Sequence, residues 1–376
     1  MKKIRVGLCG FGFIGKMHSL AYKTMNISTA SAGITPELRA LCSQSTKENE
    51  DYLYVTDDFE KLVKDEELDL IDICTPDFMH FDQGMKAMQK KKHVYIEKPI
   101  GQNIDQSKKM AQFAQSQGLI NQTALVMRFQ PKVVAARDFI RNGSMGEIIN
   151  FKGKIFNNAY IDPNRLVNWR LRKEMSAGGS LMDTGVHIVD LTRFLLGDIN
   201  SVRCKTSIFF KERFTDEKHS NSMEMNNDEW SFMEVELANG IKGEIETTRI
   251  AAGLQNRNYF EIFGTKAYLY IDLLSTGYLK IYNRELGKEI IGPIPPESDF
   301  AKHLSIIHPA PMFDMGVMVN THSASAMNIL INIKAGKTVH PETPTLMEAY
   351  QSQMVVEMGY RSAREQSRIV RRDEMD

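Results

Sequence analysis

The chain has 376 residues, of which 42% are hydrophobic and 25% are charged, as in an ordinary globular protein. Lysine plus arginine equals aspartate plus glutamate at 47 each, so the formal net charge is zero. This balance gives no electrostatic basis for binding nucleic acid or an acidic membrane surface, and the length is sufficient for two domains.

Residues 1 to about 125 alternate short apolar strands with helical segments. Strands are predicted at residues 4–9, 38–42, 68–74, 93–97 and 120–126. Residues 81–92 and 106–118 are amphipathic, and the second of these segments ends at Gly118, a helix-stopping residue. Such alternation predicts an α/β domain with a parallel sheet covered by helices on both faces.

The sequence Gly10-Phe11-Gly12-Phe13-Ile14-Gly15 follows the first predicted strand and opens a helix. This is the G-x-G-x-x-G pattern in the context that it requires. The glycines allow a tight turn and a close backbone approach, and the helix N-terminus then receives a pyrophosphate. Glycines also mark plain turns, but this setting favours dinucleotide binding.

The end of the second predicted strand does not distinguish NAD from NADP. The sequence there is Cys42-Ser43-Gln44-Ser45, with neither an acid for a ribose hydroxyl nor an arginine for a 2′-phosphate. Lys47 is the nearest cation.

Two further turns follow the predicted strands at residues 68–74 and 93–97, where an open sheet places its ligand. They are CTPDFMH, residues 74–80, and YIEKPI, residues 95–100. In the second, Lys98 leaves a buried strand beside Glu97, which is unusual. A surface lysine before a turn-forming proline is the competing interpretation.

From about residue 126 to residue 376 a second, α+β domain is expected. A helix at 131–143 and a strand at 147–156 begin it. Strand-rich segments follow at residues 201–210, 230–240, 241–250, 258–273 and 278–283. Glycine-marked turns between them predict antiparallel hairpins, and residues 345–365 form a final helix.

Residues 178–198 predict a helix that is apolar nearly all round and therefore buried. Asp183, His187 and Asp190 interrupt it at positions i, i+4 and i+7, which share one narrow stripe. This stripe is expected to line a cavity inside the protein.

Four cysteines are present, Cys9, Cys42, Cys74 and Cys204. They include no CxxC pair, and three of them end strand-like runs, so we expect small buried side chains and no disulfide framework. Arg5 and frequent glycines argue against a signal peptide at the N-terminus, and no run reaches the ~18 apolar residues that a membrane helix needs. We therefore expect a cytoplasmic protein.

These segments together resemble the glucose-fructose oxidoreductase/inositol dehydrogenase (Gfo/Idh/MocA) family, and among its members the inositol and glucoside dehydrogenases. The resemblance is carried by GFGFIG, CTPDFMH, EKP, NWR and residues 178–198, in the family's order and over nearly the whole chain. It implies a Rossmann domain at 1–125 that binds NAD, with NADP as the alternative. It also implies a mainly antiparallel open sheet at 126–376 that packs against another subunit, as a dimer, tetramer or higher homo-oligomer.

The resemblance also implies the site residues. Lys98, Asp183 and His187 form the catalytic set, and Trp169 and Arg170 lie near the nicotinamide. The full cofactor-binding set is expected to be Gly10, Gly12, Phe13, Ile14, Gly15, Ser43, Thr75, Pro76, His80, Glu97, Lys98, Trp169 and Arg170. His18, His80, Arg128 and Asn157 are each as compatible with a structural role as with a place at the site.

The family chemistry agrees with what these side chains can do. Oxidising a secondary alcohol requires removal of the hydroxyl proton while hydride leaves the same carbon. His187 suits the general base, Asp183 can stabilise its imidazolium, and Lys98 can donate to the substrate oxygen. Asp190 is favoured for a structural or substrate-hydroxyl role. The expected substrate is a sugar, glycoside or cyclitol.

Three other interpretations stay open. Asp183 and His187 could hold a metal ion, although no further ligand is clustered nearby in the sequence. The protein could be a non-catalytic dinucleotide-binding regulator, although a pure sensor would not require Lys98, Asp183 and His187. It could also cleave glycosides by transient oxidation of the sugar with bound NAD.

Overall fold

A computed structural model describes residues 2–29, 33–254 and 256–375. The chain forms two compact units. Unit 1 comprises Met1–Pro131 and Pro296–Tyr350, and unit 2 comprises Lys132–Pro295 and Gln351–Asp376. The first division lies close to the expected boundary at residue 125. Residues 296–350, however, were expected in the second domain and instead belong to unit 1.

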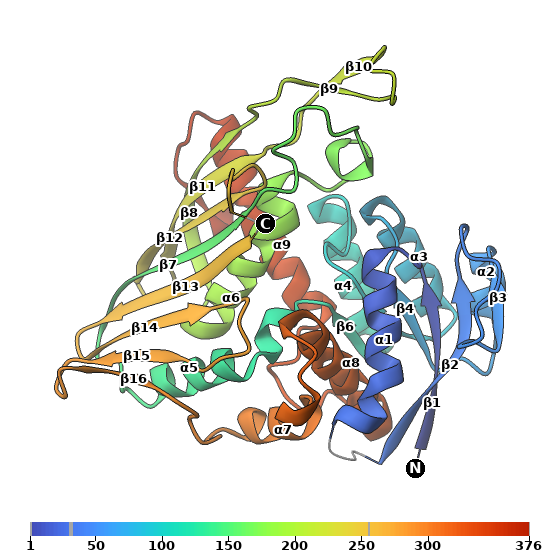
Figure 1. Ribbon diagram of the computed structural model, residues 1–376, viewed down its shortest axis with the longest axis horizontal. Helices are drawn as coiled ribbons and strands as arrows, with labels where there is room; N and C mark the ends of the chain where they lie inside the picture. The colour runs from blue at the N-terminus through green and yellow to red at the C-terminus, as the bar shows by residue number, and fades with distance from the viewer. Residues whose placement is uncertain (1, 30–32, 255, 376) are drawn as a thin grey trace. The chain divides into compact units, whose positions relative to one another are not determined.

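Unit 1 contains a six-stranded parallel sheet in the order β3-β2-β1-β4-β5-β6, which confirms the predicted doubly wound fold (Figure 1). The strands are β1 (Lys2–Cys9), β2 (Ile34–Cys42), β3 (Tyr54–Thr56), β4 (Leu70–Ile73), β5 (His93–Ile96) and β6 (Asn121–Thr123). The helices are α1 (Phe13–Ser28), α2 (Phe59–Lys64), α3 (Asp77–Gln89), α4 (Ile104–Gln117), α7 (Asp299–Ile307) and α8 (Val317–Ala335). The strand order reverses between β1 and β4, and ligands bind at such a switch point.

The helix boundaries of unit 1 follow local signals. The side chain of Asn103 accepts a hydrogen bond from the backbone N–H of Gln106 and so caps the start of α4. Gly118 ends the same helix with a left-handed φ of 62°, as predicted. The last strand is shorter than expected, because a 3₁₀ turn at Val126–Phe129 follows β6.

Polar contacts explain why α8 belongs to unit 1. Asn328 donates through Nδ2 to Oε1 of Gln122 at 2.8 Å, and Gln122 donates to the backbone and side chain of Ser325. The hydroxyl of Tyr95 also donates to Ser325. Because buried polar groups need partners, these contacts tie α8 to β5 and β6.

Unit 2 is built on a nine-stranded sheet in the order β16-β15-β14-β13-β7-β12-β11-β8-β17. The pairing of β12 with β7 is parallel and the other pairings of the described strands are antiparallel, which confirms the predicted mainly antiparallel sheet. The strands are β7 (Ile148–Asn157), β8 (Ile199–Ser207), β11 (Trp230–Leu237), β12 (Lys242–Thr248), β13 (Asn256–Gly264), β14 (Ala267–Asp272), β15 (Lys280–Asn283), β16 (Lys288–Ile291) and β17 (Val370–Arg371).

Helices α6 (Val186–Leu196) and α9 (Leu346–Arg364) lie against one face of this sheet (Figure 1). Helix α5 (Pro131–Arg141) begins at Pro131 as predicted, and β9 (Glu212–Phe214) pairs with β10 (Ser222–Glu224) in a separate hairpin. Most of α6 is buried, which confirms the expectation for this helix. Each buried aliphatic side chain stabilises the fold by about 1.5–3 kcal/mol.

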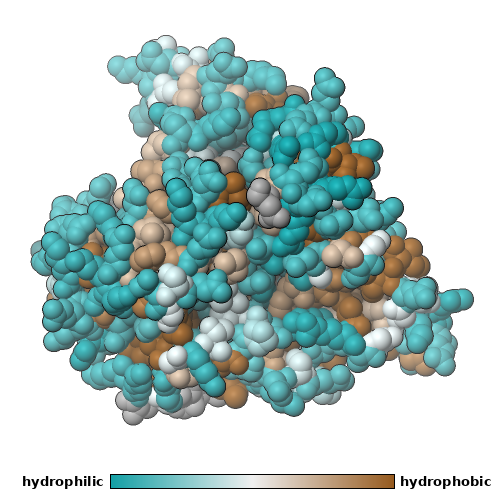
Figure 2. Space-filling model, turned by 180° about the vertical axis from the view of Figure 1, so that it is seen from behind, coloured by the Kyte–Doolittle hydropathy of each residue, from teal (hydrophilic) through white to brown (hydrophobic). Residues whose placement is uncertain are grey.

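The four cysteines are free and buried, which confirms that they behave as small core side chains. The face of the molecule drawn in Figure 2 is mainly hydrophilic, with several separate hydrophobic areas. Within the described residues, no helix is both long enough and apolar enough to cross a membrane.

Candidate active site

The glycine loop between β1 and α1 leaves open space at its centre. Gly10 has a φ of 91°, which glycine adopts without steric cost. A Cβ on Gly15 would lie 2.1 Å from the carbonyl oxygen of Gly10, so α1 can pack on the loop only with glycine there. A Cβ on Gly12 would meet no atom within 4 Å. Phe13 and Ile14 follow in the first turn of α1, so the loop offers a helix N-terminus to an anion.

The turns after β4 and β5 lie at the same edge of the sheet as the glycine loop. Thr75 and Pro76 follow β4, and Pro76 precedes the first residue of α3. Glu97 and Lys98 follow β5, where the peptide bond between Lys98 and Pro99 is cis. The sheet therefore brings the predicted strand-end residues of unit 1 together at its carboxyl edge, where open α/β sheets bind ligands.

His80 joins these two turns. Its Nδ1 lies 2.6 Å from the carbonyl oxygen of Pro99, and its Nε2 lies 2.7 Å from the carbonyl oxygen of Thr75. Both ring nitrogens are thus engaged with the backbone, and the ring is buried. The structure gives His80 a supporting role for the turns.

The end of β2 carries few groups that could select a nucleotide. Ser43 is buried, and its Oγ accepts a hydrogen bond from the backbone N–H of Thr46. Lys47 is exposed and forms an ion pair with Asp57 at 3.2 Å. This pair explains the lowered pKa of Asp57, because the Lys47 ammonium donates a hydrogen bond to its carboxylate.

In unit 2, a π-helical turn at Leu181–Gly185 carries Asp183 and leads directly into α6. Such turns are rare and occur frequently at functional sites. Asp183 and His187 are both partly exposed, whereas Asp190 is buried and accepts a hydrogen bond from Ser352. The predicted polar stripe therefore divides into two accessible groups and one structural group.

A buried carboxylate holds the start of this helix. Asp228 accepts hydrogen bonds from the backbone N–H groups of Gly179 and Leu181 and from the hydroxyl of Tyr360. A Cβ on Gly179 would lie 2.1 Å from the carbonyl oxygen of Asp228, which explains why glycine precedes the helix. Burial raises the pKa of Asp228, although these hydrogen bonds act in the opposite direction.

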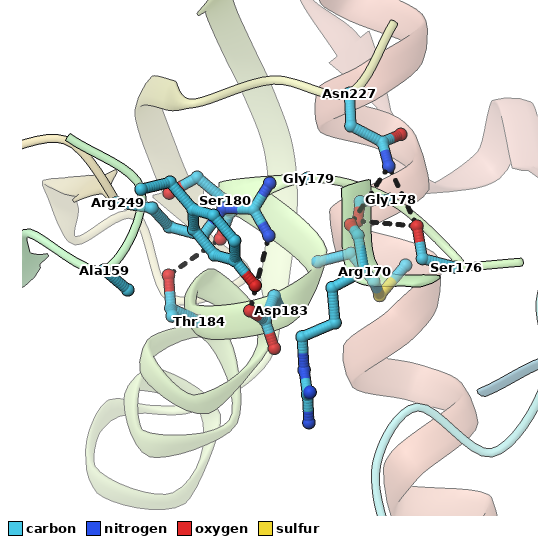
Figure 3. Close-up of polar contacts among 12 residues, drawn as sticks. Ala159, Arg170, Ser176, Gly178, Gly179, Ser180, Asp183, Thr184, Asn227 and Arg249 are labelled. Carbon is cyan, nitrogen blue, oxygen red and sulfur yellow. Dashed lines mark hydrogen bonds and ion pairs between the residues drawn. The ribbon is translucent and has the colours of Figure 1, made fainter. Parts of the chain in front are cut away.

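Arg249, directly after β12, contacts the carboxylate of Asp183. Its Nη1 lies 3.5 Å from Oδ2 of Asp183 (Figure 3). Its Nη2 donates to the carbonyl oxygen of Asp228. The guanidinium also lies over the ring of Tyr160, 4.8 Å from its centroid. The side chain of Arg249 is 1% exposed and that of Asp183 is 28% exposed. A buried guanidinium is therefore paired with a carboxylate that solvent can reach.

The sequence did not reveal Arg249, Asp228 or Tyr360 as parts of this site. Each lies on a different segment, and each is 45 or more positions along the chain from Asp183. The one available signal was a charged residue at the end of a strand that is otherwise half buried.

The Trp169–Arg170 pair lies in a 3₁₀ turn of a loop in unit 2. The side chain of Asn168 accepts a hydrogen bond from the N–H of Arg170 and caps this turn. The guanidinium of Arg170 lies over the indole of Trp169, 4.2 Å from the ring. Asn227 donates to the carbonyl oxygen of Arg170 and to Ser176, which connects the loop to the segment before the π-helical turn (Figure 3).

The other candidates are structural in the main. Arg128 is buried and forms an ion pair with Glu348 at 2.8 Å within unit 1. Asn157 ends β7, and its side chain accepts a hydrogen bond from the N–H of Ala159. His18 is buried in unit 1, where it contacts Asp72 and Glu97.

Among the described residues, two groups of three side chains are close enough to hold a metal ion. They are His18, Asp72 and Cys74, and His18, Glu97 and His322. Both groups lie in unit 1, and neither includes Asp183 or His187.

An open glycine cradle at the switch point of a parallel sheet, together with a second unit that presents an accessible Asp–His pair, is typical of a dinucleotide-dependent oxidoreductase. Comparisons with known proteins agree. Residues 4–125 match an oxidoreductase family model with an NAD-binding Rossmann fold, and residues 133–270 match the GFO/IDH/MocA C-terminal domain. The two matches together span more than half of the chain, which therefore belongs to the GFO/IDH/MocA oxidoreductase family.

Individual relatives are similar along most of their length. Levoglucosan dehydrogenase from Pseudarthrobacter phenanthrenivorans is 29% identical over 288 residues, covering 71% of this chain and 73% of the relative. The scyllo-inositol 2-dehydrogenase (NAD(+)) of Bacillus subtilis is 25% identical over 284 residues, covering 74% and 77%. A solved structure of levoglucosan dehydrogenase with NADH and levoglucosan matches with a TM-score of 0.88 and 25% identity, covering 98% of this chain and 99% of the other.

Proposed function

We propose that the protein interconverts a secondary ring hydroxyl and a ketone on a sugar, glycoside or cyclitol, with NAD(P) as the redox partner. The observation that carries this proposal is the Asp183–His187 pair. Both side chains are partly exposed on a helix that is otherwise buried, and Arg249 holds the carboxylate. A histidine in this setting suits proton removal near neutral pH.

Each group has a distinct role in the proposed oxidation. His187 removes the hydroxyl proton, and Asp183 stabilises the resulting imidazolium. Lys98 donates to the substrate oxygen as alkoxide character develops on it. The open cradle at Gly12 would hold a dinucleotide, which when bound would supply the acceptor for the hydride.

The substrate class is supported by the names of the relatives. Levoglucosan and scyllo-inositol each contain a six-membered ring that carries several secondary hydroxyls. A site that oxidises one such hydroxyl needs a base, a donor to the oxygen and a face open to the cofactor. The proposal therefore extends to the class of polyhydroxylated rings and not to one member.

The first test is to denature the purified protein and identify any released nucleotide by mass. The native enzyme is then assayed with levoglucosan, inositols and glucosides, each with NAD⁺ or NADP⁺. Formation of a ketone with an equal amount of reduced nicotinamide supports the proposal. Glycoside cleavage with retained NAD and no net reduction would instead indicate a redox-assisted hydrolase. Dinucleotide binding without turnover of any substrate would favour a regulator, and failure to bind either dinucleotide would overturn the proposal.

Replacing Arg249 with methionine is expected to lower kcat about tenfold, which corresponds to ~1.4 kcal/mol of lost transition-state stabilisation. The loss is partial because the accessible carboxylate of Asp183 keeps part of its function. The change removes a buried cation and also destabilises unit 2. Arg249→Lys restores a charge and should recover part of the turnover.

Arg213 provides a matched control for this variant. Like Arg249, it is 1% exposed and lies in unit 2, and it forms an ion pair with Glu229 at 2.9 Å. Arg213→Met should lower the melting temperature in a similar way while leaving kcat per folded molecule near the wild-type value. Equal losses of kcat in both variants would mean that Arg249 acts only through stability.

A further inference from the structure

A chain of buried polar side chains in unit 1 leads to the backbone N–H of Lys98. His18 of α1 lies between two carboxylates, with Nδ1 2.9 Å from Oδ2 of Asp72 and Nε2 3.4 Å from Oε1 of Glu97. His322 of α8 approaches the same oxygen of Glu97, with its Nε2 at 3.8 Å. The side chains of these four residues, the His18 cluster, are buried.

Burying two carboxylates in one place is costly unless cations or donors compensate them. Burial alone would lower the pKa of His18, but the carboxylate of Asp72 outweighs it and raises that pKa well above its usual value. Burial would raise the pKa of Glu97, but the neighbouring side chains of His18 and His322 hold it well below its usual value. The contacts of His18 with Asp72 and Glu97, and the direction of its pKa shift, both indicate that His18 is an imidazolium between two carboxylates.

The second oxygen of Glu97 connects this cluster to the backbone of Lys98. Oε2 accepts a hydrogen bond from the N–H of Lys98 at 3.1 Å. On the other side, Nδ1 of His80 lies 2.6 Å from the carbonyl oxygen of Pro99. The Lys98–Pro99 dipeptide is therefore held at both ends.

We propose that Glu97, held by His18 and His322, is a positioning residue that fixes the backbone from which Lys98 reaches the substrate. This inference rests on the proposed role of Lys98. His18 and His322 lie outside the predicted cofactor-binding set, whereas Glu97 and Lys98 belong to it, so we expect the cluster to affect turnover more than dinucleotide affinity. His322 lies in residues 296–350, the second of the two chain segments that make up unit 1.

The test compares Glu97→Gln, Lys98→Ala and Tyr95→Phe in the full chain. Glutamine keeps an acceptor for the N–H of Lys98 but loses the charge that holds the histidines. Tyr95→Phe is the matched control, because it keeps the ring stacked on His18 and removes only the hydrogen bond to Ser325. For each variant kcat, KM for the sugar, NADH affinity and melting temperature are measured.

Glu97→Gln is expected to lower kcat about ten- to a hundredfold, since a ~1 Å misplacement of a reacting group can cost up to ~10²-fold. Although Glu97 belongs to the predicted cofactor-binding set, NADH affinity should fall no more than about twofold, because glutamine keeps the size of glutamate and an acceptor for the N–H of Lys98. Tyr95→Phe should retain its kcat. His322→Ala, which removes one partner of Glu97, should lower kcat in the same direction and serves if Glu97→Gln does not fold.

Three outcomes contradict the inference. If Lys98→Ala loses turnover and both Glu97→Gln and His322→Ala retain it, the positioning role is wrong while the proposed function stands. If Lys98→Ala itself retains turnover, the role of Lys98 in the proposed function is wrong. If the purified protein carries one equivalent of a divalent metal that Glu97→Gln lacks, the cluster is a metal site and His18 does not act as an imidazolium.

Discussion

Replacing His187 with asparagine is expected to lower kcat by about 10²–10⁴-fold, the usual contribution of a general base. Replacing Lys98 with methionine is expected to cost about 10²–10³-fold, as for the loss of one donor to a developing oxyanion. Both residues lie outside the glycine loop that receives the pyrophosphate, although Lys98 belongs to the predicted cofactor-binding set, so NADH affinity should fall far less than kcat. Steady-state kinetics with the preferred sugar and a fluorescence titration of NADH measure the two quantities.

Thr192 on α6 gives the control for His187. It is fully buried, and its hydroxyl donates to the backbone of Ile188 within the same helix. Thr192→Val should change the melting temperature slightly and leave kcat unaltered. If both His187→Asn and Lys98→Met are folded and turn over the sugar as fast as the wild type, the catalytic assignment is wrong.

The parallel sheet of unit 1 could be predicted because its signals are local. Apolar strands and amphipathic helices alternate, and residues such as Gly118 stop the helices where the sequence indicates. The same local signals located the glycine loop and the two strand-end turns. Because the carboxyl ends of parallel strands meet at one edge, the topology then placed these segments together.

Helix α8 could not be placed in this way. It carries many small and polar residues, among them Ser325 and Asn328, and their partners Gln122 and Tyr95 lie about 200 residues earlier in the chain. A pattern of hydrophobic residues does not record such polar contacts. The expected domain boundary therefore assigned residues 296–350 to the wrong side.

The candidate site shows the same contrast. The Asp183–His187 pair stands out because polar residues interrupt a buried helix. The π-helical turn that carries Asp183, and the buried Arg249 that holds it, depend on contacts between segments far apart in the sequence. A single arginine at the end of a strand has no pattern around it that would indicate this role.

Two substitutions in the glycine loop distinguish an effect on NADH binding from an effect on folding. Gly12 has extended backbone angles, with φ at −73° and ψ at −164°, and a side chain there would meet no protein atom within 4 Å of its Cβ. Gly12→Val should therefore fold normally. Its isopropyl group would occupy the space through which a pyrophosphate approaches the helix N-terminus.

Losing two charge-assisted hydrogen bonds of about 1.5–3 kcal/mol each would weaken NADH binding roughly 10²–10⁴-fold. Gly15→Ala is the opposite case, because its Cβ would lie 2.1 Å from the carbonyl oxygen of Gly10. That variant should lose about 1–3 kcal/mol of stability through overpacking. Calorimetric titration with NADH and thermal unfolding of both variants distinguish the two effects. Normal NADH affinity in Gly12→Val would show that the loop is only a turn, and the cofactor would have to bind elsewhere.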